Sequence, residues 1–132
     1  MTDRIWRWLP ARAVIALHDE QIATHGGETG IRNGALLEAI LERPRRLAID
    51  GEPDAAQCAA ACMAGIARER PFVDANERTA LVAAYALLRI NGCELDAPEA
   101  ETVLVVTDVA AGALTEAKLA AWLRGHVSEI AP

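Results

Sequence analysis

Residues 70–79 have the sequence Arg-Pro-Phe-Val-Asp-Ala-Asn-Glu-Arg-Thr, which places an apolar side chain, a carboxylate, an amide and a guanidinium where a loop opens a helix. Asn76 is predicted to be the N-cap, because its side-chain oxygen can accept a backbone N–H that the first helical turn leaves unpaired. The other unpaired N–H groups, the positive end of the helix dipole and Arg78 make a seat for phosphate. Asp74 is a hard-oxygen ligand of the kind that Mg²⁺ uses when it bridges to phosphates. The stretch therefore outlines a site for phosphoryl or nucleotidyl transfer.

Two helices are predicted on either side of residues 70–75, which we call the signature loop. Asp54 and Gln57 form a capping-box pattern, which opens an alanine-rich helix that reaches about Ala67. A second helix is predicted over residues 77–90, ended by the Asn-Gly pair that follows it. The first helix has few polar side chains and is expected to be central. The two helices are expected to pack antiparallel and to hold the signature loop at their bend.

The remaining helices follow from periodicity and end signals. Gly26 and Gly27 are expected to end the first helix of the chain, and Pro44 is expected to close the second. Asp96 and Thr115 are expected to cap the starts of the last two helices. The predicted segments are a helix over residues 11–25, a helix near residues 34–42, a surface linker over residues 47–53, a helix from Asp96 to about Ala111, and a last helix capped by Thr115. Together they predict an all-α, single-domain helical bundle over residues 1–132.

The composition agrees with a helical domain. The chain is 52% apolar but only 4% aromatic, and the surplus is alanine, which lets helices pack closely. No apolar run reaches the ~18–20 residues of a membrane span and no signal peptide is recognisable, so a soluble, cytoplasmic protein without a membrane partner is expected. The net charge of −6 argues against direct nucleic-acid binding. The cysteines have no metal-binding spacing and are expected to be core residues: Cys58, Cys62 and Cys93.

The signature loop resembles the motif of the Fic/Doc superfamily, which runs His-x-Phe-x-(Asp/Glu)-(Ala/Gly)-Asn-(Lys/Gly)-Arg. The death-on-curing branch is the more similar one, given Asp74-Ala75-Asn76 followed by Arg78-Thr79-Ala80. Other stretches agree with it, and they are Leu17-His18-Asp19, Gly26-Gly27, Gly30-Ile31-Arg32, Leu36-Leu37-Glu38, Arg43-Pro44-Arg45 and Leu88-Arg89-x-Asn91-Gly92. The resemblance covers essentially the whole chain and implies the Fic/Doc helical fold.

Two positions depart from that motif. Arg70 stands where the family has its catalytic histidine, the general base, and Glu77 stands where death-on-curing proteins have lysine. Arginine cannot accept a proton at neutral pH, and loss of a base typically lowers the rate by about 10²- to 10⁴-fold. Exchanging the attraction of the lysine for the repulsion of Glu77 would change the interaction with phosphates by several kcal/mol at ~4 Å and an effective dielectric of ~20. Alternatively, Glu77 is simply an acid in a first helical turn, where the dipole favours it by about 0.3–1 kcal/mol.

The resemblance implies a toxin of a toxin–antitoxin pair that transfers phosphate or a nucleotidyl group from ATP, or another nucleoside triphosphate, to a protein hydroxyl, for example on a translation factor. In that scheme Asp74 holds Mg²⁺, Asn76 and Arg78 bind the phosphates, and Phe72 anchors the loop. Arg70 and Glu77 take the places of the base and the lysine, so transfer is expected to be impaired. The implied partner is an antitoxin with a disordered inhibitory segment.

Two other interpretations of the motif remain open. The chain could be a catalytically dead homologue that acts as a binding or regulatory partner of an antitoxin, or Arg70 could be an inactivating replacement made so that a toxic protein can be expressed. A packed or capping role is the simplest interpretation of His18, but an imidazole placed beside Asp74 would overturn the picture of a site without a base. The basic cluster Arg43, Arg45 and Arg46 is either a solvated helix end or lies near a flap that aligns the target polypeptide.

Overall fold

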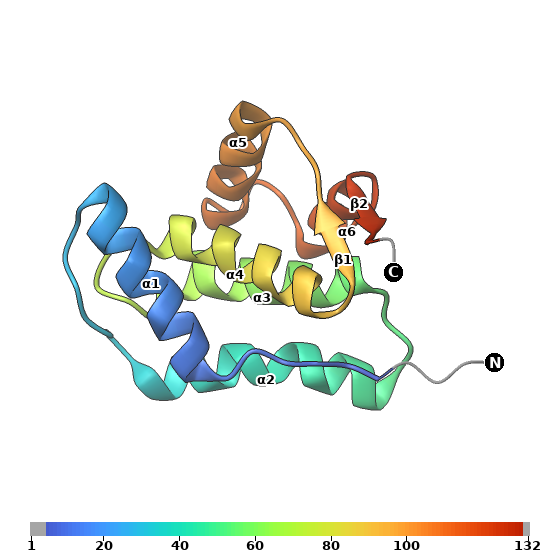
Figure 1. Cartoon of the computed structure of the whole chain (residues 1–132), viewed down its shortest axis with the longest axis horizontal. Helices are drawn as coiled ribbons and strands as arrows, with labels where there is room; N and C mark the ends of the chain where they lie inside the picture. The colour runs from blue at the N-terminus through green and yellow to red at the C-terminus, as the bar shows by residue number, and fades with distance from the viewer. Residues whose placement is uncertain (1–4, 131–132) are drawn as a thin grey trace.

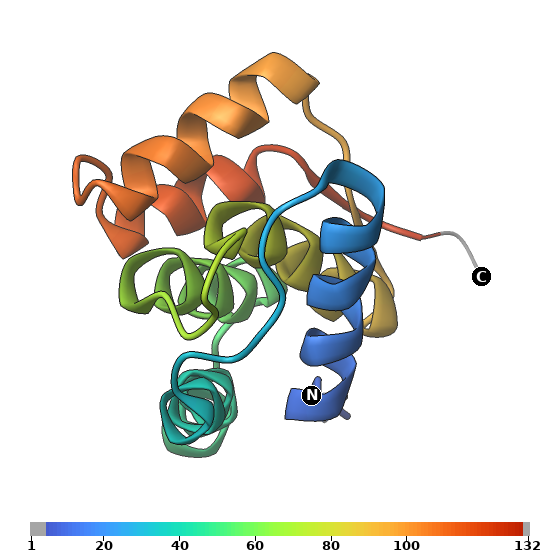
Figure 2. The same cartoon turned by 90° about the vertical axis from the view of Figure 1, so that its left-hand side faces the viewer.

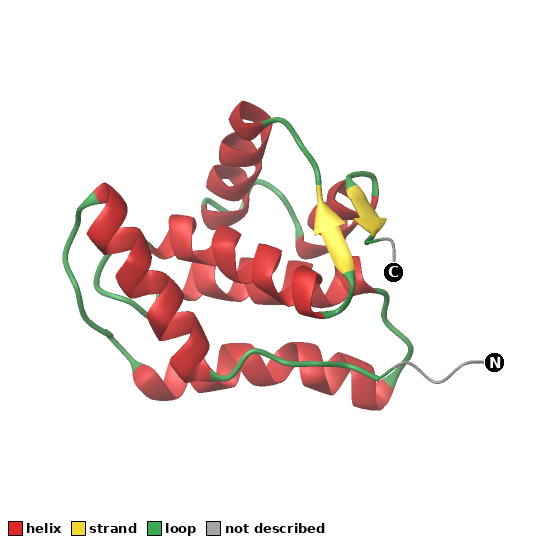
Figure 3. Ribbon diagram, viewed as in Figure 1, coloured by secondary structure: helices red, strands yellow, loops and turns green. Residues whose placement is uncertain are grey.

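The computed structural model describes residues 5–130, which form six helices and two short strands (Figures 1 and 3). The elements are α1 (Ala11–His25), α2 (Gly34–Asp50), α3 (Ala55–Glu69), α4 (Asn76–Ile90), β1 (Cys93–Leu95), α5 (Glu99–Ala110), α6 (Glu116–Arg124) and β2 (Val127–Glu129). The all-α prediction is confirmed, although the two strands were not expected. That residues 1–132 make a single domain stays a prediction.

The central element is α3, which packs against α2, α4, α5 and α6. Its start is the predicted capping box, because Asp54 accepts the Gln57 N–H and the Gln57 side chain accepts the Asp54 N–H. Most of its residues are small and fully buried, which allows its neighbours to approach closely on every side. One close approach is at Gly65, where an added Cβ would lie 2.6 Å from Cγ2 of Ile40 on α2.

The signature loop joins α3 to α4, and the two helices run antiparallel through the middle of the molecule (Figure 1). The segment that leads from α1 to α2 runs beside this loop (Figure 2). It is fixed there by an isolated antiparallel bridge between Ile31 and Phe72 and by the Val73 N–H, which donates to the Gly30 carbonyl at 3.0 Å. The signature loop is therefore held between the α3–α4 pair and the segment that follows α1.

The two strands form an antiparallel pair in which Cys93 lies opposite Glu129 and Leu95 lies opposite Val127. The pair brings the segment after α6 back to the end of α4. Each strand has only three residues, so neither carries an alternating pattern long enough to be predicted from sequence.

Three predicted boundaries were wrong. Pro44 does not close α2, which continues through this buried residue to Asp50, so most of the expected 47–53 linker is helical. Packing of Pro44 into the core offsets the hydrogen bond that its ring removes. Asp96 does not cap α5, whose N-cap position is Pro98. The Thr115 cap is confirmed, since the Thr115 hydroxyl accepts the Lys118 N–H at 3.2 Å.

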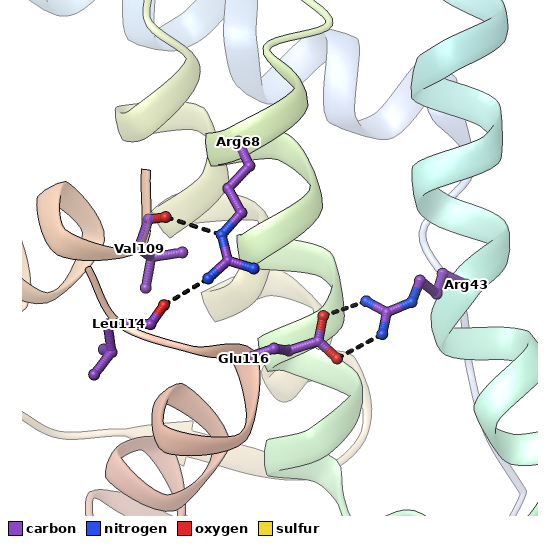
Figure 4. A network of polar contacts seen from close by, with 5 residues as sticks. All are labelled: Arg43, Arg68, Val109, Leu114 and Glu116. Atoms are coloured by element: carbon purple, nitrogen blue, oxygen red, sulfur yellow. Dashed lines mark hydrogen bonds and ion pairs between the residues drawn. The ribbon is translucent and has the colours of Figure 1, made fainter. Parts of the chain in front are cut away.

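The basic cluster lies inside α2 and not at a helix end, which corrects the first interpretation given to it. Arg43 forms a two-pronged ion pair with Glu116, and this pair joins α2 to α6 across α3 (Figure 4). Arg68 of α3 donates to the Val109 carbonyl at 3.0 Å and to the Leu114 carbonyl at 2.5 Å, which holds the turn between α5 and α6 (Figure 4). Arg45 and Arg46 are exposed.

Most buried apolar side chains of residues 5–130 form one cluster, to which all six helices contribute. Cys58, Cys62 and Cys93 are buried and are not joined by a disulfide, and burial raises the pKa of the Cys62 thiol to about 12. No helix in this part of the chain is both long enough and apolar enough to span a membrane.

Candidate functional site at the signature loop

The backbone of the signature loop reverses direction through two left-handed residues. Arg70, which follows the last turn of α3, has φ 54° and ψ 63°, and Ala75, which precedes α4, has φ 59° and ψ 29°. Neither is a glycine, so each carries a conformational cost of about 1–3 kcal/mol that the surroundings must offset. The loop is thus held in its shape by its contacts rather than by its own preferences.

The principal local contact is made by Asn76. Its Oδ1 accepts the Phe72 N–H and its Nδ2 donates to the Phe72 carbonyl, both at 3.0 Å, while only 2% of the residue is exposed. The prediction that Asn76 is the N-cap was wrong: it is the first residue of α4, and the N-cap position is Ala75, which offers no side-chain hydrogen bond. Because its polar atoms are committed to Phe72, Asn76 acts on the loop and does not project toward solvent.

Phe72 is buried beneath the loop against a histidine of α1. The rings of Phe72 and His18 are stacked, with centroids 4.0 Å apart and planes 6° apart, and both residues are 1% exposed. The His18 imidazole also contacts the backbone of Asp74: its Nε2 lies 2.9 Å from the Asp74 carbonyl oxygen. Phe72 is therefore fixed from both sides, by Asn76 on its backbone and by His18 on its ring.

An imidazole therefore does lie beside Asp74, which the loop sequence alone did not indicate. A carbonyl oxygen only accepts hydrogen bonds, so Nε2 of His18 must carry the proton and cannot take another. The remaining nitrogen, Nδ1, belongs to a ring that is 1% exposed and lies 3.8 Å from a carboxylate oxygen of Asp19. No hydroxyl of a second protein can reach it there. His18 occupies the position of a structural residue and not that of a general base.

The Asp74 carboxylate is oriented by two backbone groups. Its Oδ2 accepts the Glu28 N–H at 3.0 Å, and its Oδ1 accepts the Ala75 N–H at 2.8 Å. These two hydrogen bonds, followed by the charge of Arg78, hold the pKa of the Asp74 carboxyl below its usual value. The group is therefore ionised at neutral pH, and each oxygen keeps a lone pair that can face a cation.

Arg78 lies in the first turn of α4 and reaches back to the end of α1. Its guanidinium donates to the Gly26 carbonyl at 3.0 Å and lies 3.5 Å from the Gln21 carbonyl. Gly27 fits between Arg78 and Asp74: its φ is +120°, and an added Cβ would lie 2.7 Å from Oδ2 of Asp74. This close approach requires glycine and brings α1 against both charged residues of the site.

The first-turn N–H groups of α4 have no side-chain cap, since Ala75 supplies none. Such groups are available to an anion, and the helix dipole favours negative charge there. The carboxylate of Asp74 and the guanidinium of Arg78 lie at this same end of α4. A single carboxylate beside backbone N–H donors fits Mg²⁺ bound as a bridge to phosphate, which keeps several waters and needs only one or two protein carboxylates. Within residues 5–130 there is no group of three or more His, Cys, Asp or Glu side chains that could hold a metal ion by themselves.

Arg70 and Glu77, which depart from the family motif, lie before and after Asp74 in the sequence. The Arg70 side chain is exposed, and only its backbone is engaged, since its carbonyl accepts from Arg32 Nε at 2.7 Å. Glu77 accepts a hydrogen bond from the Thr107 hydroxyl of α5 at 3.2 Å. The Glu77 carboxylate is thus directed to α5, which agrees better with an acid in a first helical turn than with a group facing the phosphate seat.

Sequence reasoning missed the contributions of Gly27, Glu28 and Arg32. All three precede α2 and meet the signature loop only through the fold. The Gly-Gly pair and the Gly-Ile-Arg triplet had drawn attention as parts of the resemblance, but nothing local indicates that a backbone N–H from this segment would orient Asp74.

A groove of about 590 Å³ lies between α2 and α3, apart from the signature loop. Its walls are apolar or small, and its rim carries the Arg43–Glu116 pair together with Arg68 and Glu69. None of residues 70–78 lines it. A volume of this size can receive side chains of a partner or a small ligand.

Comparison with known proteins places these features in context. The sequence model of the Fic/DOC family matches residues 8–88. The chain is 36% identical over 111 residues to "Protein kinase doc" of Escherichia phage P1, covering 83% of each protein. It is 40% identical over 74 residues to "Toxin Doc" of Mycolicibacterium smegmatis, covering 54% of this chain and 57% of that protein.

Proposed function

Because the chain belongs to the Fic/DOC family and resembles its Doc members, we propose that it is a Doc-like toxin that engages a nucleoside triphosphate with Mg²⁺ at the signature loop, and that its transfer of phosphate or a nucleotidyl group is impaired. The observation that carries this proposal is an ionised carboxylate, Asp74, at the uncapped N-terminus of α4 without a general base beside it. ATP is the expected triphosphate.

In this scheme the chain supplies a metal ligand and an anion seat. Mg²⁺, when bound, neutralises charge on the phosphates, and Asp74 would hold it through a lone pair that neither Glu28 nor Ala75 uses. The first-turn N–H groups of α4 and Arg78 would receive the phosphate oxygens. Asn76 would contribute by fixing the turn through Phe72, and not by touching phosphate.

The impairment has a chemical basis. Arg70 is charged at all working pH values and cannot accept the proton of an attacking hydroxyl. His18 donates through Nε2 to a backbone carbonyl and is buried. Removing a general base lowers the rate by about 10²- to 10⁴-fold, which leaves residual transfer at most.

We further propose a cytoplasmic antitoxin partner whose disordered segment orders on binding, and a protein target such as a translation factor. The apolar walls of the groove between α2 and α3, with Arg43, Arg68, Glu69 and Glu116 at its rim, suit such a segment. Expression of the double variant Arg70→His, Glu77→Lys should arrest growth, and a neighbouring antitoxin gene should relieve the arrest. Expression of this variant without any effect on growth would contradict the toxin role.

A second function has support from the same residues. The loop scaffold of Phe72, Asp74, Asn76 and Arg78 is intact while both Arg70 and Glu77 depart from the motif. Such a protein could act as a binding or regulatory partner of an antitoxin without any chemistry.

One assay separates the two functions. The protein is incubated with labelled ATP, Mg²⁺ and a cell lysate, beside Arg70→His and the double variant Arg70→His, Glu77→Lys. Label transfer by the variants, at least 10²-fold faster than by the unchanged chain, supports an impaired enzyme. Transfer by none of the three supports the binding partner. The control is Asp74→Asn in the Arg70→His background. It removes the proposed metal ligand and should abolish any transfer that Arg70→His restores.

A further inference from the structure

The buried imidazole of α1 is linked to the one carboxylate of the candidate site through the main chain. His18 is 1% exposed, stacks on Phe72 and donates to the Asp74 carbonyl at 2.9 Å. We infer that His18 is a positioning residue, which fixes the direction of the Asp74 carboxylate so that it can ligate a phosphate-bound divalent cation. This inference rests on the proposed function for the cation, while the positioning itself can be measured without any ligand.

The link runs through a single peptide unit. The peptide between Asp74 and Ala75 has its carbonyl held by His18 and its N–H donated to Oδ1 of Asp74 at 2.8 Å. A peptide unit is planar, so fixing the direction of its C=O also fixes the direction of its N–H. His18 therefore determines where the N–H that orients the carboxylate points. The Glu28 N–H, at 3.0 Å from Oδ2, then fixes the other oxygen.

The hydrogen bond from His18 matters because the backbone at this point is not in a relaxed conformation. Ala75 has φ 59° and ψ 29°, a region that residues with a Cβ rarely adopt. Without a donor to its carbonyl, the peptide before Ala75 could rotate toward a more favourable conformation. That rotation would remove the Ala75 N–H from Oδ1 and leave the carboxylate with one anchor in place of two.

The two contacts of His18 depend on different features of the imidazole. The stacking on Phe72, with centroids 4.0 Å apart and planes 6° apart, requires a flat ring. The contact with Asp74 requires a donor on the far edge of that ring. Phenylalanine supplies the ring without the donor, and glutamine supplies a donor without the ring. These two replacements therefore separate the two contributions.

The chain contains a matched control. His126 also places a ring nitrogen near a backbone carbonyl, with Nδ1 2.8 Å from the Trp122 oxygen, and its ring packs on Trp122 with centroids 4.5 Å apart. It lies after α6 and has no contact with the signature loop among those described for residues 5–130. His126→Phe thus removes the same kind of hydrogen bond and keeps an aromatic ring packed on Trp122, although this pair is tilted by 33°, and it does so at a distance from the site.

The test compares full-length His18→Phe, His18→Gln and His126→Phe with the unchanged protein. Calorimetry gives the ATP affinity with Mg²⁺ and with EDTA, and the ratio of the two isolates the cation. For His18→Phe we expect this ratio to fall by about 10- to 100-fold, as is typical when a partner that orients a metal ligand is removed. The affinity in EDTA, which reports on the α4 N–H groups, should stay within a factor of about two. His18→Gln should restore part of the ratio, and His126→Phe should leave it unchanged.

Amide hydrogen exchange gives the same answer without nucleotide. In His18→Phe the Ala75 and Glu28 amides should exchange faster relative to the α3 core, because their acceptor, the Asp74 carboxylate, is released. Equal exchange and an equal affinity ratio in His18→Phe would overturn the inference. If the unchanged protein binds no ATP, the proposed function fails, and the exchange rates alone decide on His18. If His18→Phe does not fold, His18→Gln and His18→Leu provide the same comparison with and without a donor.

Discussion

The two ends of α4 are held by the same chemical device in different settings. At its start, Asn76 pairs with both backbone groups of Phe72, and beyond its end, Asn91 pairs with both backbone groups of Arg7. Asn76 is 2% exposed and reaches four residues back, whereas Asn91 is half-buried and reaches 84 residues back. The first clamp shapes a site and the second attaches the N-terminal segment. An identical hydrogen-bond pattern should therefore matter more where water cannot replace it.

The largest effect is expected for Asn76→Ala. It leaves the N–H and carbonyl of buried Phe72 without partners, and at roughly 1–3 kcal/mol for each group the free energy of unfolding should fall by about 2–6 kcal/mol. Urea denaturation monitored by circular dichroism measures it. A loss below about 1 kcal/mol would show that the burial of this clamp does not decide its strength.

Gly27→Ala and Gly92→Ala extend the comparison to the backbone at the two ends. Both glycines have positive φ, but a Cβ at Gly27 would lie 2.7 Å from Asp74 Oδ2, while a Cβ at Gly92 meets no atom within 4 Å. Gly92→Ala should cost only the strain, about 1–2 kcal/mol. Gly27→Ala should cost more and also weaken ATP binding, because the Asp74 carboxylate must move. Thermal unfolding and calorimetry check both, and equal losses would contradict the crowding at Gly27.

Asn91→Ala tests the clamp at the far end. Water can reach the half-buried groups that it leaves, so the unfolding free energy should fall by about 1–2 kcal/mol, less than for Asn76→Ala. ATP affinity should not change. Urea denaturation and calorimetry on the same preparation are sufficient, and a reversed order of the two asparagines would refute the comparison.

The smallest expected effect is the pH dependence of stability that Asp74, at the start of α4, contributes. The folded-state pKa of Asp74 is lowered by its hydrogen bonds to Glu28 and Ala75, so this residue contributes stability above its unfolded pKa and loses it as pH falls through the folded value. Between neutral pH and the acid range, the unchanged protein should therefore lose slightly more stability than Asp74→Asn. Unfolding midpoints measured from pH 7 to about pH 3 test this sign.

Signals that lie within four residues of one another were predicted well, and those that join distant segments were not. The Asp54–Gln57 capping box, the Thr115 cap and the glycine that ends α1 at His25 are local, and the structure has all three. Local rules also misled, since asparagine is a good N-cap residue but Asn76 turns back to Phe72. Tertiary burial likewise overrode the expected break at Pro44.

The relative positions of the residues at the candidate site were predicted only in part. Asp74 and Arg78 lie together at the start of α4 as the loop sequence suggests, and the turn does join two antiparallel helices. The contact between His18 and Asp74 spans 56 positions, so it depends on how α1 packs against α4. No pattern within either segment encodes that distance.

The exposed position of Arg70 has a consequence for the activity that we propose. The side chain of Arg70 is exposed and supports no packed neighbour, and the turn uses only its backbone. Exchanging this residue therefore alters what the turn can do to a substrate while leaving its architecture almost untouched. Under the proposed function, a change of one surface side chain at position 70 would alter the chemistry of the molecule without altering its folding.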